Sequence, residues 1–158
     1  MLGVIGGMGP LATADFFHKL IAATSATGDE DHVPVLIHSV PQLPSRAAAI
    51  LRGGASPLPQ LLQARDRLLT AGATMLAMPC NTAHHWYNEL TLGIALPFPH
   101  IVDAVAAELP RAPVRVAIIA TAATLASGIY ADRLDAGYDW IMPSNDEYAR
   151  AVQPCIDA

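Results

Sequence analysis

A cysteine followed by polar residues is the feature of this sequence that most directly suggests chemistry. Cys80 stands in the run Pro79-Cys80-Asn81-Thr82-Ala83-His84, after a short apolar segment with the pattern of a buried strand and before a predicted helix. A thiol at the start of a helix has a lowered pKa, so part of it is thiolate near neutral pH. Asn81 and Thr82 would add hydrogen-bonding groups to the same pocket. The alternative is that Cys80 is a buried small residue, which is the commoner role of a lone cysteine.

A metal site is a second alternative for this segment. Cys80 and His84 lie one helical turn apart, and His85 follows directly. A structural zinc site needs four closed ligands, and the sequence contains no Cys-x-x-Cys pair. We therefore predict no metal at this position.

A glycine-rich loop follows the first predicted strand. Gly6-Gly7-Met8-Gly9-Pro10 would let a ligand approach backbone N–H groups at the start of a helix, where anions are favoured. Through Ala12 the loop also fits the loose G-x-G-x-x-G/A pattern of dinucleotide-binding proteins. That pattern needs an acidic residue at the end of the second strand, where Ser39-Val40 stand instead. A dinucleotide site and a purely structural tight turn are the alternatives.

Two further segments carry groups that could hold an anion. Arg46, in the loop Pro44-Ser45-Arg46, could bind a carboxylate in a bidentate pair, although an arginine standing alone is usually a solvated surface residue. Thr121 and Thr124, with Ser127, follow another buried strand and would repeat the anion cradle of the glycine loop. Capping of a helix by Thr124 is an equally weighted alternative.

The elements that must position these residues alternate between strands and helices, which is typical of βαβ units with a parallel sheet. Strands are predicted over residues 2–6, 33–40, 74–78, 114–120 and 138–142. Helices are predicted over residues 11–24, 46–51, 57–71, 82–90, 102–109 and 125–136, with Asn81 as the cap of the fourth. Ser144 and Glu147 form a capping box that opens a last helix, which contains Pro154. We predict an α/β fold with a first lobe over residues 1–98 and a partial second lobe over residues 99–158.

Composition excludes several other classes of protein. The chain has 158 residues, of which 53% are hydrophobic and 15% charged, the reverse of a disordered chain. Two cysteines are too few for a disulfide scaffold. Nine basic against fourteen acidic residues give a net charge of −5, so we expect no nucleic-acid partner.

The same composition bears on location. Residues 1–10 lack the basic start and apolar run of a signal peptide. The uncharged stretch over residues 116–130 is shorter than the roughly 20 apolar residues of a membrane span. We expect no membrane partner, a cytoplasmic protein and free thiols.

Taken together, the motifs resemble those of the aspartate/glutamate racemase family, the cofactor-independent amino-acid racemases. The resemblance covers the whole chain in order, and four motifs at these spacings are far more specific than any one of them. The matching segments are Ile5-Gly6-Gly7-Met8-Gly9-Pro10, Pro41-Gln42-Leu43-Pro44-Ser45-Arg46, Met78-Pro79-Cys80-Asn81-Thr82-Ala83-His84, and Ala120-Thr121 followed by Thr124, Ser127-Gly128 and Tyr130.

The resemblance implies a two-lobed, Rossmann-like enzyme that racemises aspartate or glutamate without a cofactor. It implies a substrate held between the lobes and a thiol on each lobe that exchanges the α-proton from opposite faces. Cys80 then corresponds to the acid/base of the first lobe, and Arg46 to an arginine that holds a substrate carboxylate. The remaining substrate-binding positions are Met8, Asn81, Thr82, Thr121 and Thr124. Relatives are commonly dimers, so we expect a homodimer.

The sequence departs from the family at its second thiol. The family's second cysteine lies in a Gly-Cys-Thr-Glu-like motif, which this sequence lacks, and Cys155 on the last predicted helix is not its equivalent. We therefore expect a C-terminally shortened member with weak or no racemisation. A lobe that binds an acidic amino acid without turnover is the alternative function, since it needs no second cysteine.

Overall fold

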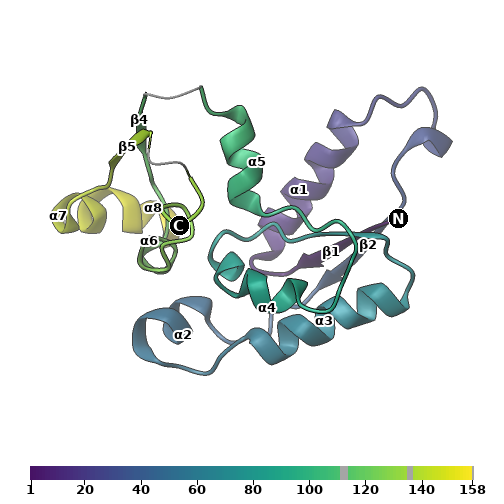
Figure 1. The fold of residues 1–158 in the computed structure, drawn as a ribbon, viewed down its shortest axis with the longest axis horizontal. Coiled ribbons are helices and arrows are strands. Elements are labelled where there is room, and N and C mark those ends of the chain that lie inside the picture. The colour runs from purple at the N-terminus through teal and green to yellow at the C-terminus, as the bar shows by residue number, and fades with distance from the viewer. Residues whose placement is uncertain (111–113, 135–136, 158) are drawn as a thin grey trace.

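The computed structural model describes residues 1–110, 114–134 and 137–157, and in these it contains two parallel β-sheets. The three-stranded sheet and its helices form what we call the first body, and the two-stranded sheet and its helices form the second body (Figure 1). The N-terminus lies in the first body and the C-terminus in the second, and α5 (Ile101–Glu108) stands between them. The predicted α/β fold with parallel sheets is confirmed.

The first sheet has β1 (Leu2–Gly6) at its centre, between β2 (Val35–Ser39) and β3 (Met75–Ala77). All five residues of β1 are buried, as expected for a central parallel strand covered on both faces. Gly6 pairs with Ser39 of β2, and Val4 pairs with Ala77 of β3. The carboxyl ends of the three strands therefore meet at one edge of the sheet.

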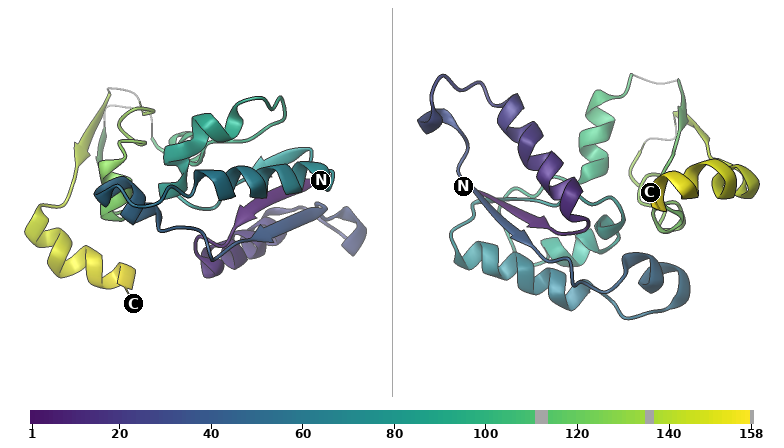
Figure 2. Two further views of the ribbon diagram at one scale, coloured as in Figure 1. Left: turned by 90° about the horizontal axis from the view of Figure 1, so that it is seen from below. Right: turned by 180° about the vertical axis from the view of Figure 1, so that it is seen from behind.

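Helices cover both faces of this sheet. Figures 1 and 2 show α1 (Pro10–Ala23) on one face and α3 (Leu58–Thr70) on the other. Pro10 takes the first position of α1, where a missing N–H group costs nothing. Gly72 follows α3 with φ +91°, a conformation that favours glycine. The other helical elements of the first body are η1 (Asp29–Asp31), α2 (Arg46–Arg52), η2 (Thr82–Trp86) and α4 (Tyr87–Thr91).

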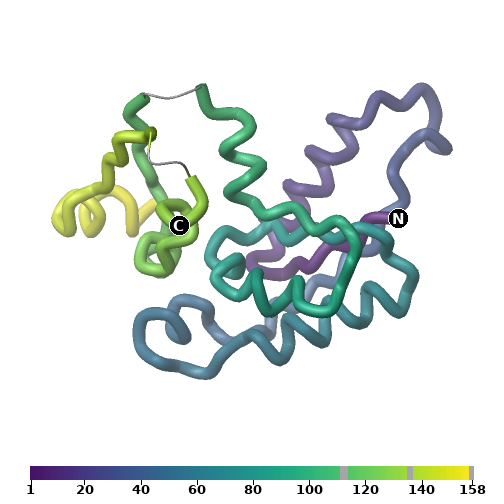
Figure 3. Tube along the Cα trace, viewed as in Figure 1, coloured from purple at the N-terminus to yellow at the C-terminus, as the bar shows by residue number. Residues whose placement is uncertain are grey.

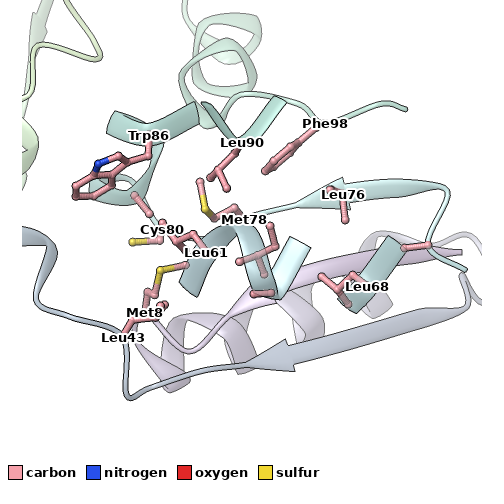
Figure 4. Close-up of a cluster of buried hydrophobic side chains, with 14 residues drawn as sticks. Met8, Leu43, Leu61, Leu68, Leu76, Met78, Cys80, Trp86, Leu90 and Phe98 are labelled. Carbon is pink, nitrogen blue, oxygen red and sulfur yellow. The ribbon is translucent and has the colours of Figure 1, made fainter. Parts of the chain in front are cut away.

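The core of the first body lies between the sheet, α3 and the η2–α4 segment (Figure 4). Leu61, Leu76 and Leu90 are fully buried there. Cys80 and Met8 belong to the same cluster and lie side by side at one end of it (Figure 4). The apolar core thus continues to the sheet edge where the candidate site residues lie.

The second body is built on β4 (Val114–Ala117) and β5 (Tyr138–Ile141), which are parallel. Val102 of α5 packs with Ile129 and Leu134 in a separate core. The remaining helical elements are α6 (Ala122–Ala126), α7 (Asn145–Glu147), η3 (Tyr148–Val152) and α8 (Gln153–Asp157). Within the described residues, no helix has the length and apolar character needed to cross a membrane.

Two predictions about helices in the second body are corrected. The helix expected over residues 125–136 is instead the short α6, which ends at Ala126 before Gly128 takes φ +71°. Residues 135 and 136 of that prediction lie outside the described residues. Thr121 caps this helix, because its hydroxyl accepts from the Thr124 N–H at 3.1 Å, so Thr124 is not the cap.

The capping box of Ser144 and Glu147 is confirmed, and the expected last helix follows it. The helix is not regular throughout, because η3 forms a π-helical turn directly before α8. Pro154 stands in α8, and proline lacks the N–H group and crowds the preceding turn. The irregular turn and the proline thus stand together in this last helix, and both are known causes of helix kinks.

Candidate functional site

Three loops at the carboxyl edge of the first sheet carry the predicted site residues of the first body. The loop after β1 carries Met8, the segment after β2 leads to Arg46 at the start of α2, and the loop after β3 carries Cys80. Open α/β sheets bind ligands at this edge because loops from neighbouring strands converge there. The sheet topology therefore explains why residues so far apart in the sequence come together.

The glycines of the loop after β1 are explained by close packing. Gly7 has φ +92°, and a Cβ at this position would lie 2.4 Å from the backbone nitrogen of Val40. A Cβ on Gly6 would lie 2.5 Å from Cγ2 of Thr13. The Gly7 N–H group donates to the Thr13 hydroxyl at 2.9 Å, and that hydroxyl donates to the Gly9 carbonyl at 3.1 Å. Thr13, one turn into α1, thus occupies an N–H group that the sequence suggested for an anion.

Cys80 is buried, and its surroundings shift the pKa of its thiol in opposite directions. Burial raises the pKa of the Cys80 thiol, and the N–H groups of Ala83 and Thr82 and the guanidinium of Arg46 lower it by a smaller amount. The net direction is upward, against the lowered pKa that a helix start predicts. The reason is that η2 is a short 3₁₀ turn and that the side chain lies within the apolar core.

Three threonine hydroxyls meet where the two bodies come together. The Thr82 hydroxyl lies 2.7 Å from that of Thr124 and 3.2 Å from that of Thr121, and the latter two lie 2.9 Å apart. Thr82 belongs to the first body, and Thr121 and Thr124 to the second. We call these three side chains the threonine cluster. It joins the start of η2 directly to the start of α6.

Asn81 also takes part in this junction, but not as a helix cap. Its side chain caps no helical N–H group, and its Oδ1 instead accepts from the Tyr130 hydroxyl at 2.6 Å. Asn81 thus stands at the predicted N-cap position, before η2, but the predicted side-chain cap is absent and a tertiary partner from the second body takes its acceptor. At the first residue of α6, the Tyr148 hydroxyl accepts from the Ala122 N–H at 2.7 Å.

A cavity of about 590 Å³ opens between the two bodies. Its walls come from the loops after β1 and β3, from α5, from β4 and the segment after it, and from η3 and α8. Six of the seven predicted site residues line it: Met8, Cys80, Asn81, Thr82, Thr121 and Thr124. Arg46 does not line it and lies beside the Cys80 thiol instead. Figure 3 shows the segment with α2 leaving the first sheet toward α6, which it contacts.

The cavity is also lined by residues that the sequence motifs do not predict as site residues. Tyr130 and Trp140 contribute aromatic side chains. Cys155 of α8 lines the same cavity as Cys80, which its position on the last helix did not indicate. Its thiol is exposed and lies 3.2 Å from the Ala151 carbonyl oxygen, to which it donates. No local sequence signal could have placed this side chain, because it reaches the cavity only through the packing of α8 in the second body.

Two α/β bodies with a thiol, an amide and threonine hydroxyls at their junction define a two-lobed α/β protein with a cleft between its lobes. Its family follows from comparison with known proteins. The chain belongs to the Asp/Glu/hydantoin racemase family, whose model matches residues 5–155. The resemblance found in the sequence motifs is thereby confirmed.

Individual relatives agree with this assignment. The chain is 28% identical to the broad specificity amino-acid racemase RacX of Bacillus subtilis strain 168, covering 100% of this chain and 70% of the relative. Among solved structures, an aspartate racemase of Picrophilus torridus is 32% identical with a TM-score of 0.81, covering 94% of this chain. An aspartate racemase homologue from Pyrococcus horikoshii OT3, 24% identical with a TM-score of 0.70, shares the fold. The chain spans 64% of the Picrophilus structure and 65% of the Pyrococcus one.

Proposed function

We propose that this chain binds an acidic amino acid, aspartate or glutamate, between a first lobe of residues 1–98 and a second lobe of residues 99–158. The observation that carries the proposal is the cavity that Cys80 shares with Asn81 and the threonine cluster. The separate sheets and separate cores support the two lobes. Racemase relatives that match nearly the whole chain support the substrate class and the reaction type.

In the proposed reaction, the Cys80 thiolate removes the α-proton of the bound amino acid. The electron pair of the broken C–H bond moves into the carboxylate, which becomes an enediolate. Because the α-proton is very weakly acidic, donors must stabilise this charge, and Asn81 and the threonine hydroxyls are the donors at hand. Arg46, half-buried beside the thiol, would favour the thiolate and hold a substrate carboxylate. Return of a proton from the thiol completes the exchange.

Met8 would shape the pocket beside Cys80. All these steps use side chains of the chain, so the proposal includes no cofactor. Burial raises the pKa of the Cys80 thiol, and the thiolate fraction therefore grows with pH. We expect the rate of exchange to rise from neutral to alkaline pH.

The proposed exchange takes place on one face of the substrate. We leave Cys155 out of the reaction because its exposed thiol donates to the backbone of its own helix. Full racemisation requires a second acid/base on the opposite face. We therefore expect α-proton exchange with retention of configuration and little or no conversion between enantiomers.

Incubation of the protein with L- and D-aspartate and L- and D-glutamate in deuterated water tests this. The expected result is loss of the α-proton NMR signal for one enantiomer, abolished in Cys80→Ser and retained in Cys155→Ser. Exchange that survives Cys80→Ser would refute the role of Cys80. Full racemisation that survives Cys155→Ser would refute the one-sided reaction.

A binding lobe without turnover is the second candidate function. The raised pKa of Cys80 favours it, since a mostly protonated thiol is a weak base. Asn81 and the threonine cluster could hold a carboxylate without any thiolate. Calorimetry distinguishes the two: binding of aspartate or glutamate unchanged in Cys80→Ala, with no deuterium exchange in the parent protein, would establish the binding lobe.

We also propose that the protein is a cytoplasmic homodimer. The segments that follow β4 and β5 offer apolar surface for a second copy, since Ile119 is 76% and Met142 49% exposed. Both cysteines are free, as expected in a reducing compartment. Light scattering gives the mass in solution, and a monomer at micromolar concentration would refute the dimer.

A further inference from the structure

A buried histidine lies directly behind Cys80. His84 is only 3% exposed, and it does not line the cavity between the bodies. Its Nδ1 lies 2.8 Å from the Cys80 carbonyl oxygen, and its Nε2 lies 3.2 Å from the backbone nitrogen of Ile101. An N–H group must donate to Nε2, so Nε2 carries no proton. The ring is therefore neutral, with its proton on Nδ1 and donated to the Cys80 carbonyl.

The surroundings of His84 favour this neutral form. Burial lowers the pKa of His84 to about 4, with a smaller contribution from the Arg133 guanidinium in the same direction, while the hydrogen bond to the Cys80 carbonyl and the Asp103 carboxylate act in the opposite direction. Arg133 and Asp103 pair with each other through two hydrogen bonds of 2.8 and 3.0 Å. The His100 ring meets His84 edge to face at 4.6 Å, and the Tyr87 ring stacks on it at 5.8 Å.

The two hydrogen bonds of His84 connect different parts of the molecule. The carbonyl belongs to the same residue as the thiol, in the loop after β3. The N–H group belongs to Ile101, the first residue of α5, which packs in the core of the second body. One imidazole thus joins the loop of the thiol to the helix that supports the opposite wall of the cavity. Only a side chain that carries both a donor and an acceptor, spaced like the two ring nitrogens, can make these two hydrogen bonds together.

We propose that His84 is a positioning residue for Cys80. Its neutral imidazole fixes the main chain of Cys80 against the first turn of α5, and so sets the place of the thiol relative to the threonine cluster across the cavity. The role in catalysis rests on the proposed function, whereas the effect on the thiol does not. A direct acid/base role is excluded by the contacts, because both ring nitrogens are already engaged with backbone groups.

Two substitutions separate the two hydrogen bonds. In His84→Asn the amide nitrogen takes the place of Nδ1, which keeps the bond to the Cys80 carbonyl and loses the one to Ile101. In His84→Gln the amide oxygen takes the place of Nε2, which keeps the bond from Ile101 and loses the one to Cys80. Each variant is made with Cys155→Ser, so that Cys80 is the only thiol.

The first readout is the rate of alkylation of Cys80 by iodoacetamide across pH 6–10. We expect His84→Asn to stay within threefold of the parent and His84→Gln to alkylate at least fivefold faster, because its loop is no longer held. The second readout is α-proton exchange, where we expect kcat to fall by tenfold to a hundredfold in His84→Gln while KM changes less than threefold. Equal behaviour of the two variants, or a His84→Gln variant indistinguishable from the parent, would overturn the proposal.

A measurement on the unmodified protein keeps the test independent of variant folding. ¹⁵N NMR of the His84 imidazole at pH 7 should show a protonated Nδ1 and an unprotonated Nε2. The opposite tautomer or a charged ring would overturn the proposal. If the parent protein exchanges no α-proton, the proposed function fails, but alkylation and NMR still decide the role of His84.

Discussion

The buried histidines of this protein predict a loss of stability in mild acid. His100 is 3% exposed, and its Nδ1 accepts the Val102 N–H at 3.1 Å, so its ring caps α5 in the neutral form. Burial lowers the pKa of His100 from 6.5 to about 4, and the neighbouring His84 and Arg133 add to this direction, while Asp103 opposes it. His84 shows a shift of the same size.

The sign and size of the effect follow from these values. The folded-state pKa lies below that of the unfolded chain, so the unfolded chain binds more protons between pH 6.5 and 4. The stabilisation is fully present above pH 6.5 and is lost as the pH falls toward 4. Between pH 7 and pH 5 one such histidine lowers the free energy of unfolding by about 2 kcal/mol, and two lower it by about 4 kcal/mol. That is a large part of the roughly 5–15 kcal/mol of an ordinary domain.

The assay is urea unfolding of the wild type and two variants at pH 7 and pH 5. His100→Asn keeps a good capping acceptor for the Val102 N–H group but cannot protonate. It should lose about 2 kcal/mol less than the wild type between the two pH values. His18→Asn is the matched control, because His18 is exposed, and it should behave as the wild type does. The reasoning is refuted if His100→Asn loses as much stability as the wild type.

The remaining predictions concern the glycine loop and the thiols. Gly7→Ala should destabilise the protein by about 3 kcal/mol or more, because it adds a clash with Val40 to a strained φ of +92°. Gly53→Ala, at φ +63° with open space around it, should cost only about 1 kcal/mol, and equal losses in urea unfolding would contradict the packing argument. Iodoacetamide should modify the exposed Cys155 at least ten times faster than the buried Cys80, as peptide mass spectrometry can follow. Equal rates would show that Cys80 is not sheltered as described.

The sequence predicted best what local chemistry determines. The run over residues 2–6 and the capping box of Ser144 and Glu147 were found at their observed places because each depends on a few neighbouring residues. The expected helix over residues 125–136 was wrong because Gly128 interrupts it, in a segment whose apolar spacing still resembles a helix.

For the candidate site, the sequence predicted the residues but not the partners that they contact. Six of the predicted residues line one cavity. Strand order takes the loops of Met8 and Cys80 to one edge of the first sheet, whereas Thr121 and Thr124 reach the cavity from the separate second sheet. The partners of those residues could not be predicted. Asn81 meets Tyr130, and Thr82 meets Thr121 and Thr124, across separations of 39 to 49 residues. From its position in the sequence, His84 suggests a metal ligand and not a positioning residue, because nothing in the sequence shows that the Ile101 N–H group would bind its Nε2.

The threonine cluster has a consequence that follows from counting protons. Three hydroxyl groups own three protons, and their three mutual contacts, at 2.7, 2.9 and 3.2 Å, can use all of them. A carboxylate brings acceptor oxygens and no proton. A hydroxyl that donates to a bound carboxylate must therefore stop donating to its neighbour within the cluster. Two of the three contacts in the cluster join the first body to the second. Binding of a carboxylate in the cleft and contact between the two bodies therefore compete for the same hydrogen-bond donors.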